Sequence, residues 1–543
     1  MAHLVAELGL SDYAFYAWDA RGHGLSDGSR GDCPDVATAV RDLDVWARHI
    51  ARQDGIALAD MSVIAQSVGA VIAAAWVHVY APPLKALVLA SPAFNVRLWV
   101  PFAKPCLRAL RALRGKFFVK SYVKSALLTN DPERCASYKA DPLVTRPISV
   151  DMLLDLAKVS DKLVADAAAI NCPVQLLISE DDYVVSQAPQ HEFFNSLSSA
   201  IKERHVLTGF RHDTLGEKDR AHVLARVHRF IEDQFSVEHT SERTTTLLSA
   251  DRSGPYRMEY DRLSTPLPSW SLQSAWWRLQ RWSIRIGSHF SRGMDIGCRA
   301  GFDSGASLDH VYRNQPSAKA LGAFGRVIDK TYINAIGWRG IRQRKRNIED
   351  LLCLAMDRLK AEGEQVAMAD IAAGQGAYVV DAITGREDEF ARLTLRDLCK
   401  NNIDAGQQKL RKLGLCASVF RFEQGDAFDV HQLAQLGPDL NLGVVSGLYE
   451  LFPDNAPLRS SLQGLAQAIL PGGYLIYTNQ PWHPQLEFIA RALTSHRDGQ
   501  PWVMRRRSQA EMDALVSEAG FEKIEQRIDR WGIFSVSLAV RRQ

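Results

Sequence analysis

The sequence has few cysteines, and they show no pattern typical of a metal site or a disulfide framework. Its 543 residues contain eight cysteines, of which no two form a C-x-x-C pair. Structural zinc sites usually contain such pairs, and secreted disulfide-rich domains have a much denser cysteine set. We therefore predict no metal site and a reducing, cytoplasmic environment.

Apolar runs and charge excess are also absent. The sequence has no run of about 18 apolar residues, the length that a membrane-spanning helix needs. Its first 18 residues, MAHLVAELGLSDYAFYAW, lack the basic start and long apolar core of a secretory signal. Lys and Arg number 65 against 62 Asp and Glu, a net charge of +3 that does not favour a nucleic-acid partner. For the basic cluster at residues 342–346, RQRKR, we predict a solvated helix face, and contact with phosphate or lipid head groups is the alternative.

The length predicts more than one domain. At about 100–200 residues per domain, 543 residues correspond to two to four domains, and we expect two large ones. The composition is that of an ordinary globular protein, with 46% hydrophobic and 23% charged residues. Residues 237–268 are polar and punctuated by proline, which predicts a linker. The first domain is thus expected over residues 1–236.

Strands and helices alternate in the first half. YAFYAWD at 13–19, MSVIAQ at 61–66 and LKALVLASPA at 84–93 are predicted strands, with helical segments between them. Such alternation predicts an α/β fold with a parallel sheet, whose functional groups lie at the carboxyl ends of the strands. Residues 94–165 interrupt the pattern with basic helical segments. We predict that they form an inserted cap over the site.

Ser67 follows the second of these predicted strands. It lies in A-x-S-x-G, from Ala65 to Gly69, close to the G-x-S-x-G pattern of a strained strand-to-helix turn that carries a nucleophile. Small flanking residues suit such a turn because larger side chains would collide there. A serine that opens a helix is also an ordinary N-cap. The five residues alone leave both interpretations open.

Two later loops favour the nucleophile. Asp182 in ISEDDYVV and His212 in GFRHDTL each follow a predicted strand, so the order along the chain is Ser, acid, His. A serine nucleophile needs an imidazole to take its proton and a carboxylate to orient that imidazole. Asp181 competes with Asp182, which we prefer because DYVV leads into the next helix. We predict Ser67, Asp182 and His212 as catalytic residues.

These motifs, together with WDARGHGLSDG at 18–28, resemble the monoacylglycerol lipase and lysophospholipase branch of the α/β-hydrolases. The resemblance covers about residues 1–235 and implies a carboxylic ester substrate whose acyl chain lies under the cap. In that family, earlier strands and a loop precede the D-x-R-G-H-G strand and provide half of the oxyanion hole. Here only 18 residues precede Asp19. We expect a sheet without its first strands and an oxyanion hole that keeps the Val68 N–H.

A basic amphipathic segment opens the second half. In SWSLQSAWWRLQRWSIRIG, at 269–287, Arg278, Arg281 and Arg285 share one helical face and Leu272, Trp276 and Leu279 another. Such a helix with tryptophans could lie at a membrane surface, but we favour the alternative, a helix packed on a neighbouring domain. Residues 269–345 are predicted as a helical lead-in to the second domain.

A glycine loop follows the next predicted strand. The strand ends at Asp370 and runs into Ala372, Gly374 and Gly376, small residues that let a ligand approach the backbone, and we predict that all four bind the cofactor. Nicotinamide enzymes and methyltransferases share such loops. Asp397, 21 residues after Gly376, is suited to bind ribose hydroxyls.

The loop, Asp397, GDA at 425–427 and LPGGYLIYTNQ at 470–480 resemble class I S-adenosylmethionine-dependent methyltransferases, here expected as a Rossmann-like domain over residues 346–543. The resemblance implies S-adenosylmethionine as cofactor. Gly374 and Gly376 would border its methionine part, Asp397 its ribose, and Asp426 with Ala427 its adenine. SGASLDHVYRNQP, AIGWRGIRQRK, SGLYELFPDN and NQPWHPQ resemble bacterial proteins that fuse an α/β-hydrolase to such a methyltransferase.

Candidate acceptor-binding residues follow the fourth and fifth strands of this domain: Tyr449, Glu450, Asn479, Trp482 and His483. His483 is either a general base or part of a rigid loop between two prolines, and Glu450 either contacts substrate or caps a helix. The sequence thus predicts a bifunctional serine ester hydrolase and methyltransferase acting on a small-molecule or lipid substrate. In the alternative, the hydrolase half is catalytically impaired and docks the methyltransferase on its substrate or on a membrane.

Overall fold

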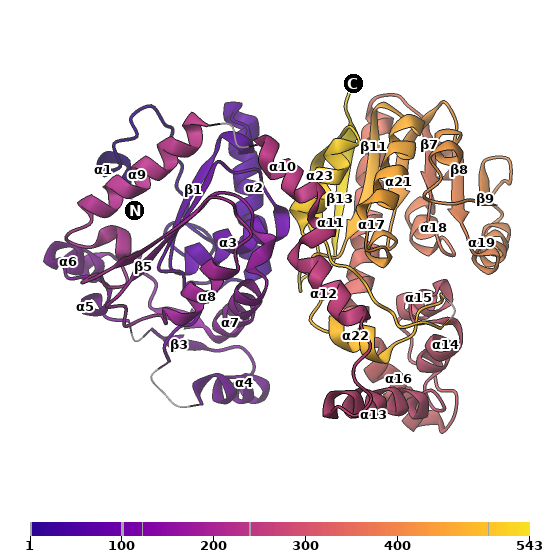
Figure 1. Cartoon of the computed structure of the whole chain (residues 1–543), viewed down its shortest axis with the longest axis horizontal. Helices are drawn as coiled ribbons and strands as arrows, with labels where there is room; N and C mark the ends of the chain where they lie inside the picture. The colour runs from indigo at the N-terminus through magenta and orange to yellow at the C-terminus, as the bar shows by residue number, and fades with distance from the viewer. Residues whose placement is uncertain (1–2, 99–101, 122, 238–239, 498) are drawn as a thin grey trace. The chain divides into compact units, whose positions relative to one another are not determined.

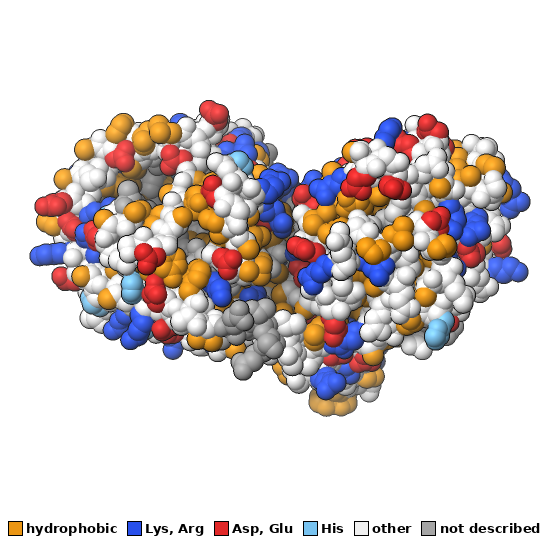
Figure 2. Space-filling view, turned by 90° about the horizontal axis from the view of Figure 1, so that it is seen from above, with side chains coloured by type: hydrophobic (Ala, Val, Ile, Leu, Met, Phe, Trp, Pro, Cys, Tyr) orange, Lys and Arg blue, Asp and Glu red, His pale blue; other side chains and the backbone are white. Residues whose placement is uncertain are grey.

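A computed structural model describes residues 3–98, 102–121, 123–237, 240–497 and 499–543 (Figure 1). The chain divides into two compact units, residues 1–243 and Thr244–Gln543, and each is described by itself. The two-domain α/β architecture predicted from the sequence is confirmed. Basic and acidic side chains are interspersed over both units on the face drawn in Figure 2, as the nearly balanced charge implies.

Unit 1 is built on a parallel sheet in the order β1-β2-β5-β6. Its strands are β1 (Ser62–Gln66), β2 (Ala86–Ala90), β5 (Val174–Ser179) and β6 (Lys202–Leu207). The helices around it are α1 (His3–Glu7), α2 (Val36–Asp54), α3 (Val68–Tyr80), α8 (Ala188–Ser196) and α9 (Ala221–Ser236). The apolar side of α9 packs with α1 and β2 in one core. This sheet brings the carboxyl ends of β1, β5 and β6 to one edge.

The predicted strand at residues 13–19 does not form. The segment has no regular secondary structure and is mostly exposed, while β1 pairs only with β2 and is the edge of the sheet. Side chains fasten the segment to α2 instead, since Trp18 stacks on Trp46 with ring centroids 5.5 Å apart and the Tyr16 hydroxyl donates to Asp54. An apolar run becomes a strand only where a neighbouring strand can pair with its backbone groups.

The predicted cap is an insertion between β2 and β5. It comprises α4 (Ala103–Arg114), β3 (Phe118–Lys120), α5 (Ser125–Leu128), α6 (Pro132–Ala140), β4 (Pro147–Ser149) and α7 (Val150–Ala165). Strands β3 and β4 form a small antiparallel pair. Residues 99–101 and 122 of the cap lie outside the described residues.

Most of the predicted linker is helical. It contains α10 (Thr240–Leu248), α11 (Ala250–Ser253) and α12 (Pro255–Ser264), whereas residues 238–239 lie outside the described residues. The polar composition concealed two buried anchors, Tyr256 and Leu263. Arg257 also pairs with Asp454. From Thr244 onward the segment therefore belongs to unit 2.

Unit 2 contains a seven-stranded sheet in the order β12-β13-β11-β10-β7-β8-β9. The strands are β7 (Val366–Asp370), β8 (Phe390–Asp397), β9 (Phe420–Gln424), β10 (Leu440–Val445), β11 (Ile469–Asn479), β12 (Phe521–Ile528) and β13 (Ser535–Arg541). All pairs from β11 to β9 are parallel, and β12 and β13 are antiparallel. The chain runs from β7 outward to β9 and then returns to the other side of β7. Ligands of such sheets bind where the order reverses, here between the ends of β7 and β10.

Helices cover both faces of this sheet (Figure 1). One core contains α17 (Ile336–Ala361), α18 (Ala377–Ile383) and α19 (Lys400–Lys412), and the other contains α20 (Val430–Ala434), α21 (Asn455–Ala468) and α23 (Gln509–Glu518). A third core joins the helices α13 (Leu272–Gly287), α14 (Arg292–Ala300), α15 (Gly305–Arg313), α16 (Gly322–Ile333) and α22 (Leu486–Ala492). Among helices of the described residues, none is both long and apolar enough to cross a bilayer.

Candidate functional sites

Ser67 lies in a strained turn between β1 and α3. Its backbone angles are φ 56° and ψ −119°, in a region that costs a non-glycine residue about 1–3 kcal/mol. The strain is held by flanking hydrogen bonds, since the Ser67 N–H donates to the Ala90 carbonyl and the Ala93 N–H to the Ser67 carbonyl. The Ser67 side chain does not cap α3. The N-cap interpretation therefore does not describe this serine.

The Ser67 hydroxyl instead lies beside the imidazole of His212. The distance from Ser67 Oγ to His212 Nε2 is 2.7 Å, and Asp182 Oδ2 lies 2.8 Å from His212 Nδ1. The second oxygen of Asp182 accepts the backbone N–H groups of Val184 and Val185. Asp182 and His212 are buried, whereas Asp181 is exposed. The carboxylate can thus hold the histidine tautomer that leaves Nε2 free to take a proton from serine.

The histidine loop is tied to β1 and to the cap. Gln66 donates to Asp213 Oδ1 and accepts the Leu215 N–H, so the residue before Ser67 positions the loop that carries His212. Arg134 of α6 donates to the other oxygen of Asp213. One oxyanion donor is evident, because Val68 opens α3 and its N–H has no acceptor within the helix. Val68 is 37% exposed, so this edge is open to solvent.

In unit 2, the glycine loop joins β7 to α18. Gly374 and Gly376 adopt φ of +58° and +70°, which favour glycine. A Cβ on Gly376 would come within 2.9 Å of Phe422, so packing requires glycine there. No atom lies within 4 Å of a Cβ built on Gly374. The space beside Gly374 is therefore open to a ligand.

Asp397 holds this loop from the end of β8. Its Oδ2 accepts the Gly374 N–H at 2.9 Å, and its Oδ1 accepts the Cys399 N–H and the Asn402 side-chain amide. Asp426, which follows β9, is exposed, and its Oδ1 accepts the Phe428 N–H. Two carboxylates and an open glycine loop thus line the ends of three adjacent strands. These two acceptors and the open loop fit the hydroxyls and adenine of a nucleoside cofactor.

Asp370 serves a different purpose from Asp397 and Asp426. It is fully buried, its Oδ1 accepts the Ala372 N–H, and its Oδ2 accepts the Tyr378 hydroxyl at 2.5 Å. Burial raises the pKa of Asp370 to about 7, against the lowering effect of these hydrogen bonds. Through these two hydrogen bonds, Asp370 fixes the start of the glycine loop and the first turn of α18.

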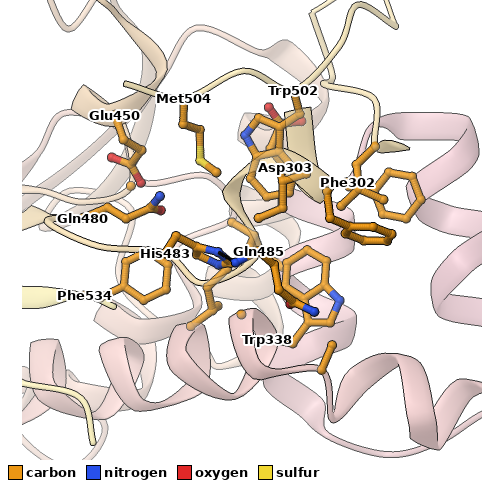
Figure 3. A pocket seen from close by; sticks show the side chains of 18 of the residues that line it. Phe302, Asp303, Trp338, Glu450, Gln480, His483, Gln485, Trp502, Met504 and Phe534 are labelled. Carbon is orange, nitrogen blue, oxygen red and sulfur yellow. Dashed lines mark hydrogen bonds between the residues drawn. The ribbon is translucent and has the colours of Figure 1, made fainter. Parts of the chain in front are cut away.

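A cavity of about 220 Å³ lies beyond the ends of β10 and β11 (Figure 3). Its wall is largely aromatic and aliphatic, with Phe302, Tyr332, Trp338, Phe488, Trp502 and Phe534 contributed by segments far apart in the sequence. The polar groups are few: Asp303, Arg344, Glu450, Gln480, His483 and Gln485. Apolar cavities with a few placed polar groups are the usual form of small-molecule sites.

Two of the five predicted acceptor-binding residues, Glu450 and His483, line this cavity. The other three have structural contacts elsewhere. The Tyr449 hydroxyl donates to Ser461, and the Asn479 amide donates to the Arg507 carbonyl. The Arg506 guanidinium lies over the Trp482 ring, 5.6 Å from the ring centroid. Neighbouring side chains at a strand end point in different directions. Their position in the sequence therefore could not tell the residues that line the cavity from those that do not.

His483 is held as a hydrogen-bond donor toward the cavity. Its Nδ1 accepts the Gln485 N–H at 3.0 Å, so the proton of the neutral ring resides on Nε2. Burial, reinforced by Arg506, lowers the pKa of His483 to about 3. A Cβ on Gly337 would come within 2.9 Å of Nε2, so glycine at the start of α17 makes room for the ring. Of the two interpretations that the sequence left open for His483, this arrangement favours the rigid loop over the general base.

Arg344 is the cavity's buried cation. The sequence placed it on a solvated basic face, yet it is 4% exposed, its Nη1 lies 3.5 Å from Glu450 Oε1, and its guanidinium lies over the Phe534 ring. Within the RQRKR cluster Arg344 is buried, Arg342 and Lys345 are half-buried and Arg346 is exposed, as the helical period separates the faces of neighbouring residues. The aromatic residues of the cavity wall could not be identified from the sequence, because an isolated aromatic residue more often belongs to a hydrophobic core than to a binding site.

Comparisons with known proteins agree with this two-part organisation. The pattern of a family described as putative methyltransferase matches residues 227–541, and that of serine aminopeptidase, S33, matches residues 1–219. The fold and these matches define a hydrolase-like unit joined to a methyltransferase-like unit. The chain belongs to the putative methyltransferase family.

Three relatives illustrate the likeness. The chain is 51% identical to an uncharacterized protein, YnbC, of Escherichia coli (strain K12), over 100% of this chain and 92% of that protein. It is 28% identical to a monoacylglycerol lipase of Mycolicibacterium smegmatis over 42% of this chain and 81% of the lipase. Among solved structures, magnesium protoporphyrin IX methyltransferase of Synechocystis PCC 6803 with bound SAH matches with a TM-score of 0.30 and 15% identity, covering 46% of this chain and 97% of that one.

Proposed function

We propose that the protein is a bifunctional cytoplasmic enzyme, in which unit 1 hydrolyses carboxylic esters and unit 2 transfers methyl groups from S-adenosylmethionine. The contact of Ser67 with His212, completed by Asp182, carries the first assignment. The open glycine loop clamped by Asp397 supports the second. The ester substrate is proposed to be acylglycerol-like or lysophospholipid-like, with its acyl chain under the cap.

The hydrolytic steps follow from the positions of the three side chains. His212 Nε2 takes the proton of Ser67 as Oγ attacks the ester carbonyl, and the Val68 N–H stabilises the oxyanion. His212 then gives that proton to the departing alcohol, leaving an acyl-Ser67 ester, which water hydrolyses with His212 again as base. Asp182 holds the imidazole in the tautomer that these transfers need and stabilises its positive charge.

In unit 2, Asp397 and Asp426 would hold the adenosine part of the cofactor, and Gly374 and Gly376 would border its methionine part. Bound S-adenosylmethionine supplies an electrophilic methyl group on a sulfonium. The role of this chain is to bind cofactor and acceptor in line and to exclude water, as substrate-positioning sites do.

The acceptor is proposed to bind in the aromatic cavity. Its apolar wall favours an apolar body, such as a lipid or a lipid-derived molecule. Gln480 and Trp502 line this cavity. Their side-chain nitrogens, Gln480 Nε2 and Trp502 Nε1, are buried and have no hydrogen-bond partner among the described residues. Unpaired buried donors are costly, so the acceptor is expected to present oxygen atoms to them. His483 Nε2–H adds a third donor.

A second candidate function rests on the exposed edge of unit 1. Among the described residues no strand pairs with the outer edge of β1, and Val68 beside the nucleophile is open to solvent. Loss of one oxyanion-hole donor costs about 100- to 1000-fold in rate. Unit 1 would then bind acyl groups and deliver substrate to an active methyltransferase.

Labelling with a fluorophosphonate probe separates these candidates. Bifunctionality predicts labelling of the wild type that disappears in Ser67→Ala while S-adenosylmethionine binding, measured by calorimetry, stays unchanged. Cofactor binding without any labelling would favour the docking module. Absence of both, in a folded chain, would refute the proposed function.

A further inference from the structure

Helix α13 has large apolar side chains that the fold does not bury. It packs on α14 and α22 through Ile284, Gly287 and Trp277, whose ring lies 6.3 Å from that of Phe488. Another stripe, recurring every three or four residues, faces outward and contains Trp276, Leu279, Trp282 and Ile286. Trp276 is 55% exposed and Trp282 60%. A helix with one face already packed has no structural need for a second apolar stripe.

Three arginines form a neighbouring stripe on the same helix. Arg278, Arg281 and Arg285 recur at the same helical interval and are exposed. They form no ion pair among the described residues, although Arg281 donates to the Arg491 carbonyl at 2.7 Å. Together with Leu279 and Trp282, they line a surface groove. This groove combines cationic donors with an apolar floor.

The segment from α13 to α16 is one-sided in the charge that it exposes. Between Leu272 and Ile333 there are nine Lys and Arg side chains, all exposed, and four Asp side chains with no Glu. All four acidic side chains are buried or half-buried, at positions 295, 303, 309 and 329. The surface of this segment is therefore cationic, unlike the mixed face in Figure 2.

The apolar surface continues onto α16. Leu321, Phe324 and Val327 are exposed at intervals of three residues. The Phe324 ring lies 5.8 Å from that of Phe290, which follows α13, so the two surfaces adjoin. Figure 1 shows both helices at the same end of unit 2.

We propose that the outer faces of α13 and α16 bind an anionic phospholipid bilayer, with the arginine groove taking a phosphate headgroup and the tryptophans entering the interface. Tryptophan and arginine side by side on an amphipathic helix suit the headgroup level of a membrane. A second copy of this chain fits less well, because two equally cationic surfaces would face each other. Nucleic acid would leave the apolar stripe uncovered. The inference does not rest on the proposed function.

Co-sedimentation of the full chain with lipid vesicles tests this. One set contains phosphatidylcholine alone, and the other replaces a quarter of it with phosphatidylglycerol. Binding is expected only to the anionic vesicles and should weaken with salt. Replacing Arg278, Arg281 and Arg285 by Gln should lower the affinity on the order of 100-fold, at about 1 kcal/mol for each charge near the surface. Trp276→Ser with Trp282→Ser should also weaken binding.

A matched control removes the same charge from another helix. Lys400, Arg411 and Lys412 on α19 are exposed, and replacing them by Gln should leave vesicle binding unchanged. Circular dichroism establishes that each variant is folded. Equal loss in both triple variants, equal binding to both vesicle types, or no binding would overturn the proposal. So would self-association that the Trp276→Ser and Trp282→Ser variant abolishes without any vesicle binding.

Discussion

Ser67 Oγ and His212 Nε2 lie 2.7 Å apart although 145 residues separate them in the sequence. The contact depends on Gln66, which fixes the histidine loop, and on the strained backbone of Ser67, whose side chain does not cap α3. The unusual backbone of Ser67, which contacts a buried histidine, is a cost that folding alone does not require.

The role of Asp182 can be separated from that of its neighbour. Asp182→Asn should lower kcat for hydrolysis of a p-nitrophenyl ester by about 10⁴-fold, because the imidazole would be held in the wrong tautomer. Asp181→Asn is the matched control, since Asp181 is exposed and should change the rate little. Similar losses in both variants would contradict the assignment.

Gly374 and Gly414 allow a test of cofactor binding that controls for strain. Both have positive φ, +58° and +70°, and no atom lies within 4 Å of a Cβ built on either. Replacing either glycine by alanine should therefore cost about 1–2 kcal/mol of stability. Only Gly374→Ala should also weaken S-adenosylmethionine binding in calorimetry, at least tenfold, because its methyl group would enter the cofactor's space. Equal affinities in the two variants would refute this location.

His483 should remain neutral throughout the physiological pH range. Since its pKa is lowered to about 3 and Nδ1 accepts the Gln485 N–H, nitrogen NMR should show the Nε2–H tautomer down to about pH 4. Gly337→Ala, which crowds Nε2, should disturb this signal. Titration of His483 near its ordinary pKa of about 6.5 would contradict the buried hydrogen-bonded arrangement.

Asp370 should make stability depend on pH. Its folded-state pKa of about 7 lies above the unfolded value of about 3.9, so the native state holds this proton more tightly. The raised pKa therefore adds to the free energy of unfolding at low pH. This contribution, at most about 4 kcal/mol, is complete below about pH 4 and is lost as pH rises through about 7.

Asp370→Asn removes that titration. Urea unfolding at about pH 8 should show the variant more stable than the wild type, and the difference should shrink toward about pH 5. Asp397→Asn serves as the comparison, because that half-buried carboxylate accepts three hydrogen bonds from the chain. A wild-type advantage that is constant with pH would contradict the raised pKa.

The sequence was sufficient to place residues that directly follow a strand. Ser67, Asp182 and His212 each follow a strand, and parallel strands bring their carboxyl ends to one edge whatever the loops between them. The glycine loop and Asp397 were found for the same reason. The predicted strand at 13–19 failed because a strand needs a neighbour, which its own residues cannot reveal.

The residues around the cavity were largely missed for a related reason. Trp338 comes from α17 and Trp502 from the segment before α23, yet their rings stack 6.2 Å apart. Glu450 and His483 were singled out by their position after strands, whereas Arg344 seemed part of a solvated basic cluster. Which way a side chain turns depends on packing that no local pattern records.

By itself the sequence determined the two α/β units and the order of the serine, acid and histidine loops. It also determined the small residues of the glycine loop. The hydrophobic period of a segment and the backbone conformations that glycine allows both depend on residues close together in the sequence. Only the tertiary structure decided that Ser67 meets His212, that Arg344 is buried, and that Trp276 and Trp282 stay exposed. Those outcomes depend on contacts between distant segments, whose energies exist only once the chain has folded.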